Sequence, residues 1–418
     1  MSTSPAASRT ALSRSLWIVL VLLALSAFFN YIDRGNLSIA AELIKGDLKL
    51  SDRDLGTLLS SFFWTYALCH VAAGWFVDRF RVSWVIAGGF FLWSIVTAAT
   101  GLVTGFSMLI ALRMLLGIGE SVAYPSYSKF LAGYFPEHHR GLANALIDAG
   151  SKSGPAIGTL AGGLLMAVYG WRPFFVVLGA VNLLWLVPWF IWMPRGSHVA
   201  RGTRQDAPPF FEILRQRSAW GSFAGLFCTN YFWYFLLTWL PSYLVRERQF
   251  SMKQMATIGA AAYFCIAVST TVSGWLSDRL IARGGTPTRV RKTFAAVGLS
   301  LSTIILPVAL VGDRTTATML LMLACFSFGI FNCCLWAITQ TIAGPRAAGK
   351  WVGLQNCIGN MAGWVSPWLT GVVLDATHRF YWAFVIAAAV QVLAIFMFVI
   401  VIGPVVPCTW ETRREITR

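Results

Sequence analysis

The sequence predicts an all-α polytopic membrane protein with twelve transmembrane helices in two pseudo-symmetric six-helix bundles. Three observations predict it: the composition, a series of membrane-length apolar stretches and a motif that recurs half a chain later. Of 418 residues, 57% are hydrophobic and 12% are charged, and the mean hydropathy is +0.65. A soluble domain carries about 25% charged residues. This chain therefore has too few polar groups to cover a surface in water.

About twelve stretches have the length and composition of membrane-spanning helices, each of which needs roughly 20 mostly apolar residues. Alternation with a period of two is absent, which argues against a barrel and for helices. In chain order the predicted spans cover residues 15–38, 55–77, 82–103, 105–133, 139–168, 172–193, 220–245, 252–280, 291–312, 315–343, 348–375 and 380–405.

A short motif occurs twice, at the end of the second and the eighth predicted span. Residues 74–80 read GWFVDRF and residues 274–280 read GWLSDRL, an offset of 200. The equal position of both copies favours a duplication of six helices over a chance match. Internal repeats with a binding site between them are typical of secondary transporters. We therefore expect an N-terminal bundle at 1–193, a cytoplasmic linker at 194–219 and a C-terminal bundle at 220–418.

The positive charges are distributed unevenly between the two sides of the membrane. The formal net charge is +16, from 33 Lys and Arg against 17 Asp and Glu. Counted with the flanks of each span, 21 of the 33 fall on the side that carries both termini, nine on the other side and three within spans. Lys and Arg accumulate on the cytoplasmic side. We therefore expect both termini in the cytoplasm of a cell with this protein in its inner or plasma membrane, and a basic surface that meets lipid headgroups rather than nucleic acid.

Enzyme, metal and cofactor signatures are missing from the sequence. SYSK at 126–129 matches S-x-x-K without the partner motifs of that enzyme class, and GSKSG at 150–154 has lysine where a nucleophilic serine would stand. The eight cysteines show no metal spacing, and we expect them to be small buried hydrophobes. The first apolar run is too long for a cleaved signal peptide. We expect no enzyme activity, cofactor or metal.

Arg113 and Glu120 are charged residues inside one predicted span. They are seven residues apart, which places them on the same side of a helix. One interpretation is a static buried ion pair. The other is an arginine that holds an anion and a carboxylate that exchanges a proton, because desolvation favours the neutral acid while a nearby arginine favours the ion.

Asp33 and Arg34 end the first span, in the stretch FFNYIDRGN at 28–36. Adjacent residues of a helix point about 100° apart, so the two side chains need separate partners on other helices or in a cavity. The alternative is that both lie in water at the membrane surface. Charges at membrane depth are costly and are usually functional.

Lys152 lies in the fifth span, within DAGSKSGPAIG at 148–158. Asp148 is four residues earlier on the same face, so the two could form a structural pair. Alternatively, Lys152 faces the pore and makes the site more positive together with Arg34 and Arg113. That arrangement favours an anion, including one with two acidic groups.

Several motifs together resemble the major facilitator superfamily, and more narrowly its anion:cation symporter family of organic-anion transporters. The likeness covers nearly the whole chain. One departure is DRFRVSW at 78–84, where Arg81 occupies a glycine position and Val82 a basic one. The motifs that carry the likeness are the repeated G-x-x-x-D-R, NYIDR at 30–34, RMLLGIGESVAYPSYSKFLAGYFP at 113–136 with the Arg-Gly at 140–141, NYFWYFLLTWLPSYL at 230–244 and NCIGNMAGWVSPWLTG at 356–371.

The resemblance implies roles for residues in these motifs. Asp33 and Glu120 resemble the proton-coupling carboxylates, and Arg34 resembles the arginine that meets a substrate carboxylate. Other polar and aromatic residues suit hydroxyls or sugar faces, with helix packing as their alternative role. The expected substrate-binding residues are Arg34, Arg113, Lys152, Tyr31, Tyr234, Trp336 and Asn356.

Two charged pairs resemble the latches that hold the cytoplasmic side of such transporters closed. They are Asp78–Arg79 and Asp278–Arg279, and their alternative role is anchoring on the positive side of the membrane. His70, eight residues before Asp78, is a lone membrane histidine that is either packed or part of proton transfer.

The combined prediction is a monomeric proton-coupled symporter of a small organic anion that works by alternating access. Sugar acids such as hexuronates, aldonates or aldarates are the favoured substrates. Aromatic or small dicarboxylates, anion exchange and sodium coupling are the alternatives within transport. A membrane enzyme and a receptor or channel on the same scaffold are alternatives outside it, and counterflow of labelled substrate separates a carrier from a receptor.

Overall fold

The computed structural model describes residues 13–135, 137–194 and 208–410. Within these ranges, side chains at 71, 78, 132, 137–142, 345, 346, 348 and 349 are not described. The helices are α1 Arg14–Ile39, α2 Ala41–Leu48, α3 Asp52–Arg79, α4 Val82–Thr100, α5 Phe106–Ser121, α6 Ala123–Tyr134, α7 Glu137–Tyr169, α8 Trp171–Leu184, α9 Leu186–Trp192, α10 Phe210–Arg215, α11 Arg217–Arg246, α12 Met252–Ala282, α13 Pro287–Ser302, α14 Ile305–Leu310, α15 Arg314–Asn360, α16 Ala362–Thr377, α17 Tyr381–Ile395 and the π-helix η1 Phe396–Val401.

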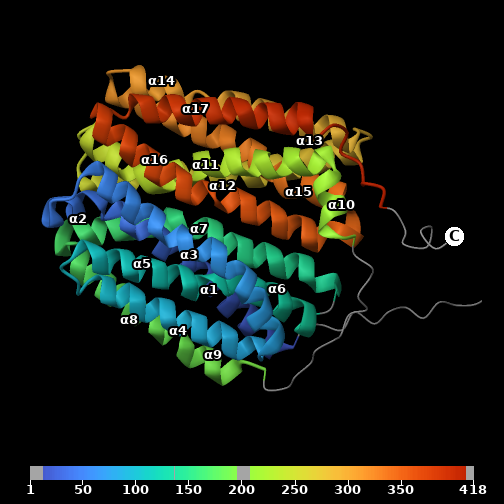
Figure 1. Cartoon of the computed structure of the whole chain (residues 1–418), viewed down its shortest axis with the longest axis horizontal. Coiled ribbons are helices and arrows are strands. Elements are labelled where there is room, and N and C mark those ends of the chain that lie inside the picture. Colours follow the sequence, from blue (N-terminus) through green and yellow to red (C-terminus); the bar gives the residue numbers. More distant parts are fainter. Residues whose placement is uncertain (1–12, 136, 195–207, 411–418) are drawn as a thin grey trace, which may run out of the picture.

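The long helices run side by side along one axis of the molecule (Figure 1). Helices α1–α9, the first group, pack mainly as α1 on α7, α3 on α5 and α4 on α8. Helices α11–η1, the second group, pack mainly as α12 and α13 on α15, and α11 on α15, α16 and α17. Contacts of α3 with α16, of α7 with α12 and of α1 with α11 join the groups. The predicted all-helical fold is confirmed, with no strand in the described ranges.

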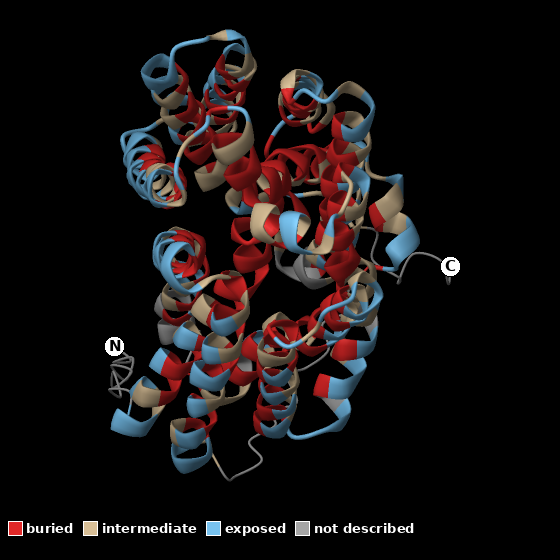
Figure 2. Ribbon diagram, turned by 90° about the vertical axis from the view of Figure 1, so that its left-hand side faces the viewer, coloured by how far each residue is buried: buried red, intermediate tan, exposed pale blue. Residues whose placement is uncertain are grey.

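Eight stretches of the described chain are long and apolar enough to cross a membrane. The other four predicted spans lie in α3, α7, α11 and the second half of α15 with α16. The helix α7 continues through Pro155, whereas Gly344 takes φ +64°, which separates two spans within α15. Buried faces meet where helices pack, and exposed segments lie outside them (Figure 2). Exposed side chains such as Leu68, Val168 and Leu184 give that outer surface an apolar character.

The predicted linker at 194–219 falls largely outside the described residues. Its described part contains α10, which packs against α11, and the Trp220 indole donates a hydrogen bond to the Leu214 carbonyl at 2.9 Å. The Lys350 ammonium donates to the Pro208 carbonyl, also at 2.9 Å. The linker segment therefore lies against the second group, and the division of the chain at this point stays a prediction.

The cysteines differ in part from the expectation of buried hydrophobes. Three are buried, four are half-buried and Cys357 is exposed. Cys333 and Cys334 lie side by side on α15, with sulfur atoms 3.4 Å apart.

The two groups meet closely at the end of the molecule that carries α2, called the α2 end; the opposite end is the α10 end (Figure 1). Backbone meets backbone there, because a Cβ on Gly56 would come within 2.7 Å of the Pro367 carbonyl oxygen and 3.0 Å of the Gly371 Cα. Likewise a Cβ on Gly163 would lie 2.5 Å from that of Ala256. These small residues allow close helix contact.

A cluster of charges also crosses between the groups at the α2 end. The Arg246 guanidinium of α11 donates to both carboxylate oxygens of Asp52, at 2.5 and 3.0 Å, and Lys45 of α2 donates to the same carboxylate. Glu42 lies 3.9 Å from Arg246. Burial raises the pKa of Glu42, and Arg246 opposes that shift. This cluster, the α2-end latch, is a bidentate ion pair between the groups that the sequence patterns did not reveal.

Candidate functional site

The centre of the candidate site is a buried ion pair between α1 and α5. The Arg34 Nε donates to a Glu120 carboxylate oxygen at 2.8 Å, and the side chains are 4% and 0% exposed. The alternative in which Asp33 and Arg34 lie in water at the membrane surface is excluded, since both are buried. An arginine and a carboxylate at this depth are stable only when each has a partner.

Aromatic rings surround the Arg34 guanidinium. Its Cζ lies 4.4 Å from the ring centroid of Tyr66, 4.9 Å from that of Tyr31 and 5.2 Å from that of Phe62. Tyr234 of the second group also lies close enough to act on Arg34 electrostatically. Ring faces attract a cation without neutralising it. The guanidinium therefore keeps affinity for an anion.

The ion pair leaves polar atoms without partners. Nη2 of Arg34, Oε1 of Glu120 and Nε of Arg113 are buried and make no hydrogen bond within the described residues. Buried polar atoms in folded proteins are almost always hydrogen-bonded, so unpaired ones indicate water, a ligand or a functional state. The donors on Arg34 and Arg113 are suited to a carboxylate.

Glu120 and Asp33 lie near enough to Arg113 to act on it electrostatically. The Arg113 Cζ lies 5.3 Å from the Phe62 ring centroid. No ion pair joins Arg113 to Glu120 among the described residues. Seven residues correspond to a rise of about 10.5 Å along a helix, so a shared face does not bring the two side chains into contact. Glu120 instead pairs with Arg34, and the static pair considered from the sequence is replaced by a pair between two helices.

Asp33 points away from Arg34, as their adjacency on a helix predicted. Its Oδ2 accepts a hydrogen bond of 2.9 Å from Nδ2 of Asn182 on α8. The carboxylate is 2% exposed, and its Oδ1 has no partner. The two adjacent charged side chains therefore lie in different surroundings. Arg34 lies at the boundary between the groups, and Asp33 lies in the interior of the first group.

Lys152 lies at the boundary between the groups. Its ammonium is 6.0 Å from the ring centroid of Trp233 on α11. No ion pair between Lys152 and Asp148 occurs among the described residues; Asp148 is exposed and accepts from Ser151 at 3.3 Å. The geometry favours the interpretation in which Lys152 faces the space between the groups.

The second group supplies a neutral polar wall. The Tyr234 hydroxyl donates to Oδ1 of Asn360 at 2.7 Å, and its ring centroid lies 4.5 Å from that of Phe63 in the first group. The Asn356 backbone carbonyl accepts from the Asn360 amide at 2.9 Å, and the Asn356 side chain is half-buried. Trp336 is 38% exposed, and no described contact joins it to the cluster around Arg34. Asn360 is therefore a direct partner of Tyr234.

The predicted latches of the G-x-x-x-D-R motifs lie toward the α10 end. The side chain of Asp78 is outside the described residues. Arg79, Asp278 and Arg279 are exposed, and Arg279 lies 5.0 Å from the Trp275 ring centroid on its own helix. The structure shows no ion pair between the groups through these three side chains, so their role as latches stays a prediction.

His70 packs on the ring of Tyr66, with ring centroids 4.5 Å apart, and its Nδ1 lies 3.2 Å from the Tyr66 carbonyl. It is thus two contacts away from Arg34. Phe62, Tyr66 and His70 recur at intervals of four and share one helix face, a signal that the sequence contained.

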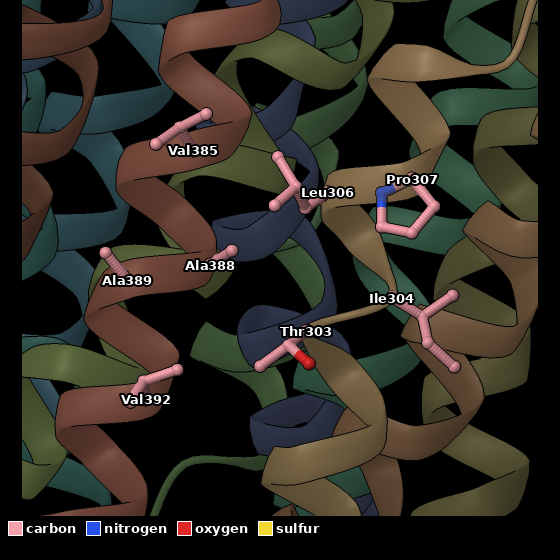
Figure 3. A pocket seen from close by; sticks show the side chains of 8 residues that line it. All are labelled: Thr303, Ile304, Leu306, Pro307, Val385, Ala388, Ala389 and Val392. Atoms are coloured by element: carbon pink, nitrogen blue, oxygen red, sulfur yellow. The ribbon is translucent and has the colours of Figure 1, made fainter.

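A groove in the second group does not have the chemistry of this site. It opens between the α13–α14 junction and α17 with a volume of about 530 Å³ (Figure 3). Its lining is Thr303, Ile304, Leu306, Pro307, Val385, Ala388, Ala389 and Val392. No charged side chain lines it, so it offers nothing to an organic anion.

The sequence model of the Major Facilitator Superfamily matches residues 23–367, which is most of the chain and includes every charged residue of the site. The chain belongs to the major facilitator superfamily. The helical architecture agrees with that membership. The superfamily consists of transporters, and an enzyme is thereby excluded as expected.

Curated relatives of this superfamily member cover nearly its full length. It is 28% identical to a probable galactarate/D-glucarate transporter of Bacillus subtilis (strain 168), over 97% of this chain and 95% of that one. It is 32% identical to a probable sulfoacetate transporter of Cupriavidus necator, over 89% and 90%. It is 29% identical to a hexuronate transporter of Bacillus subtilis, over 93% and 95%.

Among solved structures, the fold is similar to that of a bacterial homologue of the human lysosomal transporter Spinster in an inward-facing, unoccupied conformation. The TM-score is 0.80 at 21% identity, over 94% of this chain and 98% of that one. At this identity the likeness concerns the fold alone. The chain is thus a multi-pass membrane transporter, and its relatives carry small organic anions.

Proposed function

We propose that the protein is a proton-coupled symporter of an organic anion, with sugar acids as its substrate class. The observation that carries this proposal is the buried Arg34–Glu120 ion pair with unpaired atoms on both partners. A proton on Glu120 would remove the negative partner of Arg34, and the free guanidinium would then bind the substrate carboxylate. Coupling follows because an anion and a proton are each bound better when the other is present.

The remaining residues suit the rest of a sugar acid. Tyr31, Tyr66 and Tyr234 place hydroxyl groups and ring faces near Arg34, and these can meet sugar hydroxyls. The relatives named for galactarate, glucarate and hexuronate transport support the same class. No cofactor or metal takes part in this proposal.

The unequal distribution of Lys and Arg supports a cytoplasmic position for the α10 end, where the described part of the predicted linker lies. The α2 end then faces outward. Among the described residues, the hydrogen bonds, ion pairs and ring contacts between the groups extend from the α2 end only to the depth of Lys152 and Trp233. We infer that the conformation is closed to the outside, with the two groups as the units that rock during alternating access.

A screen with purified protein tests the substrate class. Thermal unfolding is measured with a panel of organic acids and matched neutral sugars at two pH values. Sugar acids should raise the unfolding temperature, more strongly at the lower pH, because the proton and the anion favour each other's binding. Stabilisation by neutral sugars but by no carboxylate would refute the proposal.

The sulfoacetate relative supports a second candidate substrate, a small anion with two acidic groups. A second acidic group needs a second cation. Lys152, which lies across the boundary between the groups from Trp233, supplies it. A dianion such as galactarate or sulfoacetate would place one acidic group on Arg34 and the other on Lys152.

Replacing Lys152 by glutamine should therefore weaken binding of galactarate by roughly tenfold and leave galactonate, which has one carboxylate, within about twofold. Competition against a labelled sugar acid in proteoliposomes gives both affinities. Lys253→Gln, at the α2 end of α12, is the control for loss of one positive charge. Equal losses for both acids would show that Lys152 does not distinguish one acidic group from two.

Asp52→Asn should open the α2 end, because it removes the charge that Arg246 and Lys45 share. In a variant without native cysteines, labels at Gly46→Cys and Gly312→Cys report the distance across that end; a Cβ at either position meets open space. The population with the longer distance should rise by roughly fivefold. Asp54→Asn is the matched control. Asp54 and Ser51 together cap the start of α3, and Asp54 does not reach the second group. Equal distance distributions in both variants would show that the latch does not hold the closed state.

A further inference from the structure

Asn182 is the amide that contacts Asp33, and no motif in the sequence assigned it a role. It lies in α8 with 0% of its surface exposed. Its Nδ2 donates to Oδ2 of Asp33 at 2.9 Å. Its predicted span, residues 172–193, is otherwise apolar apart from Arg172 at its start. A single amide at membrane depth in such a helix is costly unless it has a polar partner.

The polar groups around Asp33 are few. Among the described residues, the charged groups that act on it are Glu120 and Arg113, both from α5. Thr97 of α4 brings a hydroxyl close to the same carboxylate, and neither α4 nor α8 presents a charge to it. On its other side α1 packs against glycines of α7: a Cβ on Gly154 would lie 2.8 Å from the Tyr31 Cβ, and one on Gly158 would lie 3.1 Å from Ile32. Asn182 is thus the group with a direct hydrogen bond to Asp33.

Two unpaired atoms lie beside this hydrogen bond. Oδ1 of Asp33 and Oδ1 of Asn182 are both buried and have no partner. Two acceptor oxygens that lack donors are unfavourable while Asp33 is ionised. A proton on Asp33 would supply the missing donor. The hydrogen bond from the Asn182 amide nitrogen therefore fits the ionised form of Asp33. The free Oδ1 of Asn182 is the acceptor that the protonated form of Asp33 needs.

We propose that Asn182 is a positioning residue for proton exchange at Asp33, whose amide donates to the carboxylate and, after a half-turn, accepts from the carboxylic acid. Among uncharged side chains, only an amide has an NH₂ donor and a C=O acceptor at equivalent positions. It can therefore bond to the ionised and to the protonated form of Asp33 without movement of the helix. This inference rests on the proposed function, because it assumes that Asp33 takes up and releases a proton during transport.

The expected effect of losing Asn182 has a definite sign. A hydrogen bond to a charged group is stronger than one between neutral groups, so the amide favours the ionised carboxylate overall. Its removal makes Asp33 hold its proton to higher pH. Asn182→Leu should therefore move the pH at which half of Asp33 is ionised upward by roughly one pH unit.

The test combines two measurements on the full chain. Infrared difference spectra of the purified protein, taken over a pH range, follow the carboxylic-acid C=O band; subtraction of Asp33→Asn identifies the part that belongs to Asp33. Proteoliposomes then give the pH profile of proton-driven sugar-acid uptake. Both midpoints should shift upward in Asn182→Leu, while counterflow at constant pH stays within about threefold of the parent.

Thr100→Val is the matched control, since Thr100 is buried on α4 and its side chain bonds, among the described residues, only to the Val96 carbonyl of its own helix. Its pH profile should equal that of the parent. If Asn182→Leu fails to fold, Asn182→Asp keeps the volume, removes the amide donor and adds a second carboxyl; its Asp33 band should also move to higher pH.

Unchanged midpoints of the Asp33 band in a folded Asn182 variant would overturn the proposal. A shift equal to that in Thr100→Val would overturn it too, because it would show a general effect of lost polar groups. A shifted band in a protein that accumulates no sugar acid under any pH gradient would refute the proposed function instead, and would leave the coupling between Asn182 and Asp33 supported.

Discussion

Glu120→Gln should abolish the accumulation of sugar acid driven by a pH gradient, while exchange of labelled for unlabelled substrate remains measurable. Glutamine keeps the size and the hydrogen-bond acceptor that Arg34 Nε uses at 2.8 Å, but it cannot take up a proton. It also removes the negative charge that competes with substrate for Arg34. Substrate would then bind without a proton, so the gradient would no longer perform work on it.

Proteoliposomes with an imposed pH gradient measure accumulation, and counterflow at equal pH on both sides measures exchange. Glu212→Gln is the matched control: Glu212 is a half-buried carboxylate, but it lies in α10, outside the spans and outside the α2-end latch. That variant should keep accumulation. If Glu120→Gln still concentrates substrate against its gradient, Glu120 does not carry the coupled proton.

Arg34→Lys should weaken sugar-acid binding on the order of a hundredfold. Lysine keeps one positive charge but loses the planar fork that grips a carboxylate through two parallel hydrogen bonds. It also loses the flat face that lies 4.4 Å from the Tyr66 ring centroid. Isothermal titration calorimetry with the sugar acid that performs best in the thermal screen gives the dissociation constants.

Arg215→Lys is the control for replacing a ring-stacked arginine by lysine. Arg215 also stacks on a ring, at 4.3 Å from the Phe211 centroid, but lies in α10 far from the site. Its dissociation constant should equal that of the parent. A loss of less than about threefold in Arg34→Lys would mean that Arg34 contributes only charge, and that the two-bond contact to the carboxylate lies elsewhere.

The sequence predicted the main charged residues of the candidate site because charges at membrane depth are rare and each one is conspicuous. On that ground the sequence points to four residues, and the structure buries all of them: Asp33, Arg34, Arg113 and Glu120. The angle between adjacent helical residues also predicted that Asp33 and Arg34 have different partners, which the structure confirms.

Pairing between helices could not be predicted in the same way. Helical periodicity places Arg113 and Glu120 on one face of a helix. Only the packing of α1 against the other helices of the first group brings Arg34 to Glu120. Asn182 carries a usable signal in the sequence, a lone amide in an otherwise apolar span. The α2-end latch carried none, because Asp52 and Arg246 are 194 residues apart and look like ordinary charges at a membrane surface.

The close backbone contacts at Gly56, Gly371 and Gly163 affect how the α2 end can open. Helices that meet through small residues have smooth surfaces, with few bulky side chains inserted into the opposite helix. Such surfaces can separate or slide without rotamer changes on either side. The activation barrier to opening then depends on a few polar bonds, chiefly Asp52 with Arg246. The rate of the conformational cycle should accordingly respond to ionic strength at that end more than to the fluidity of the bilayer.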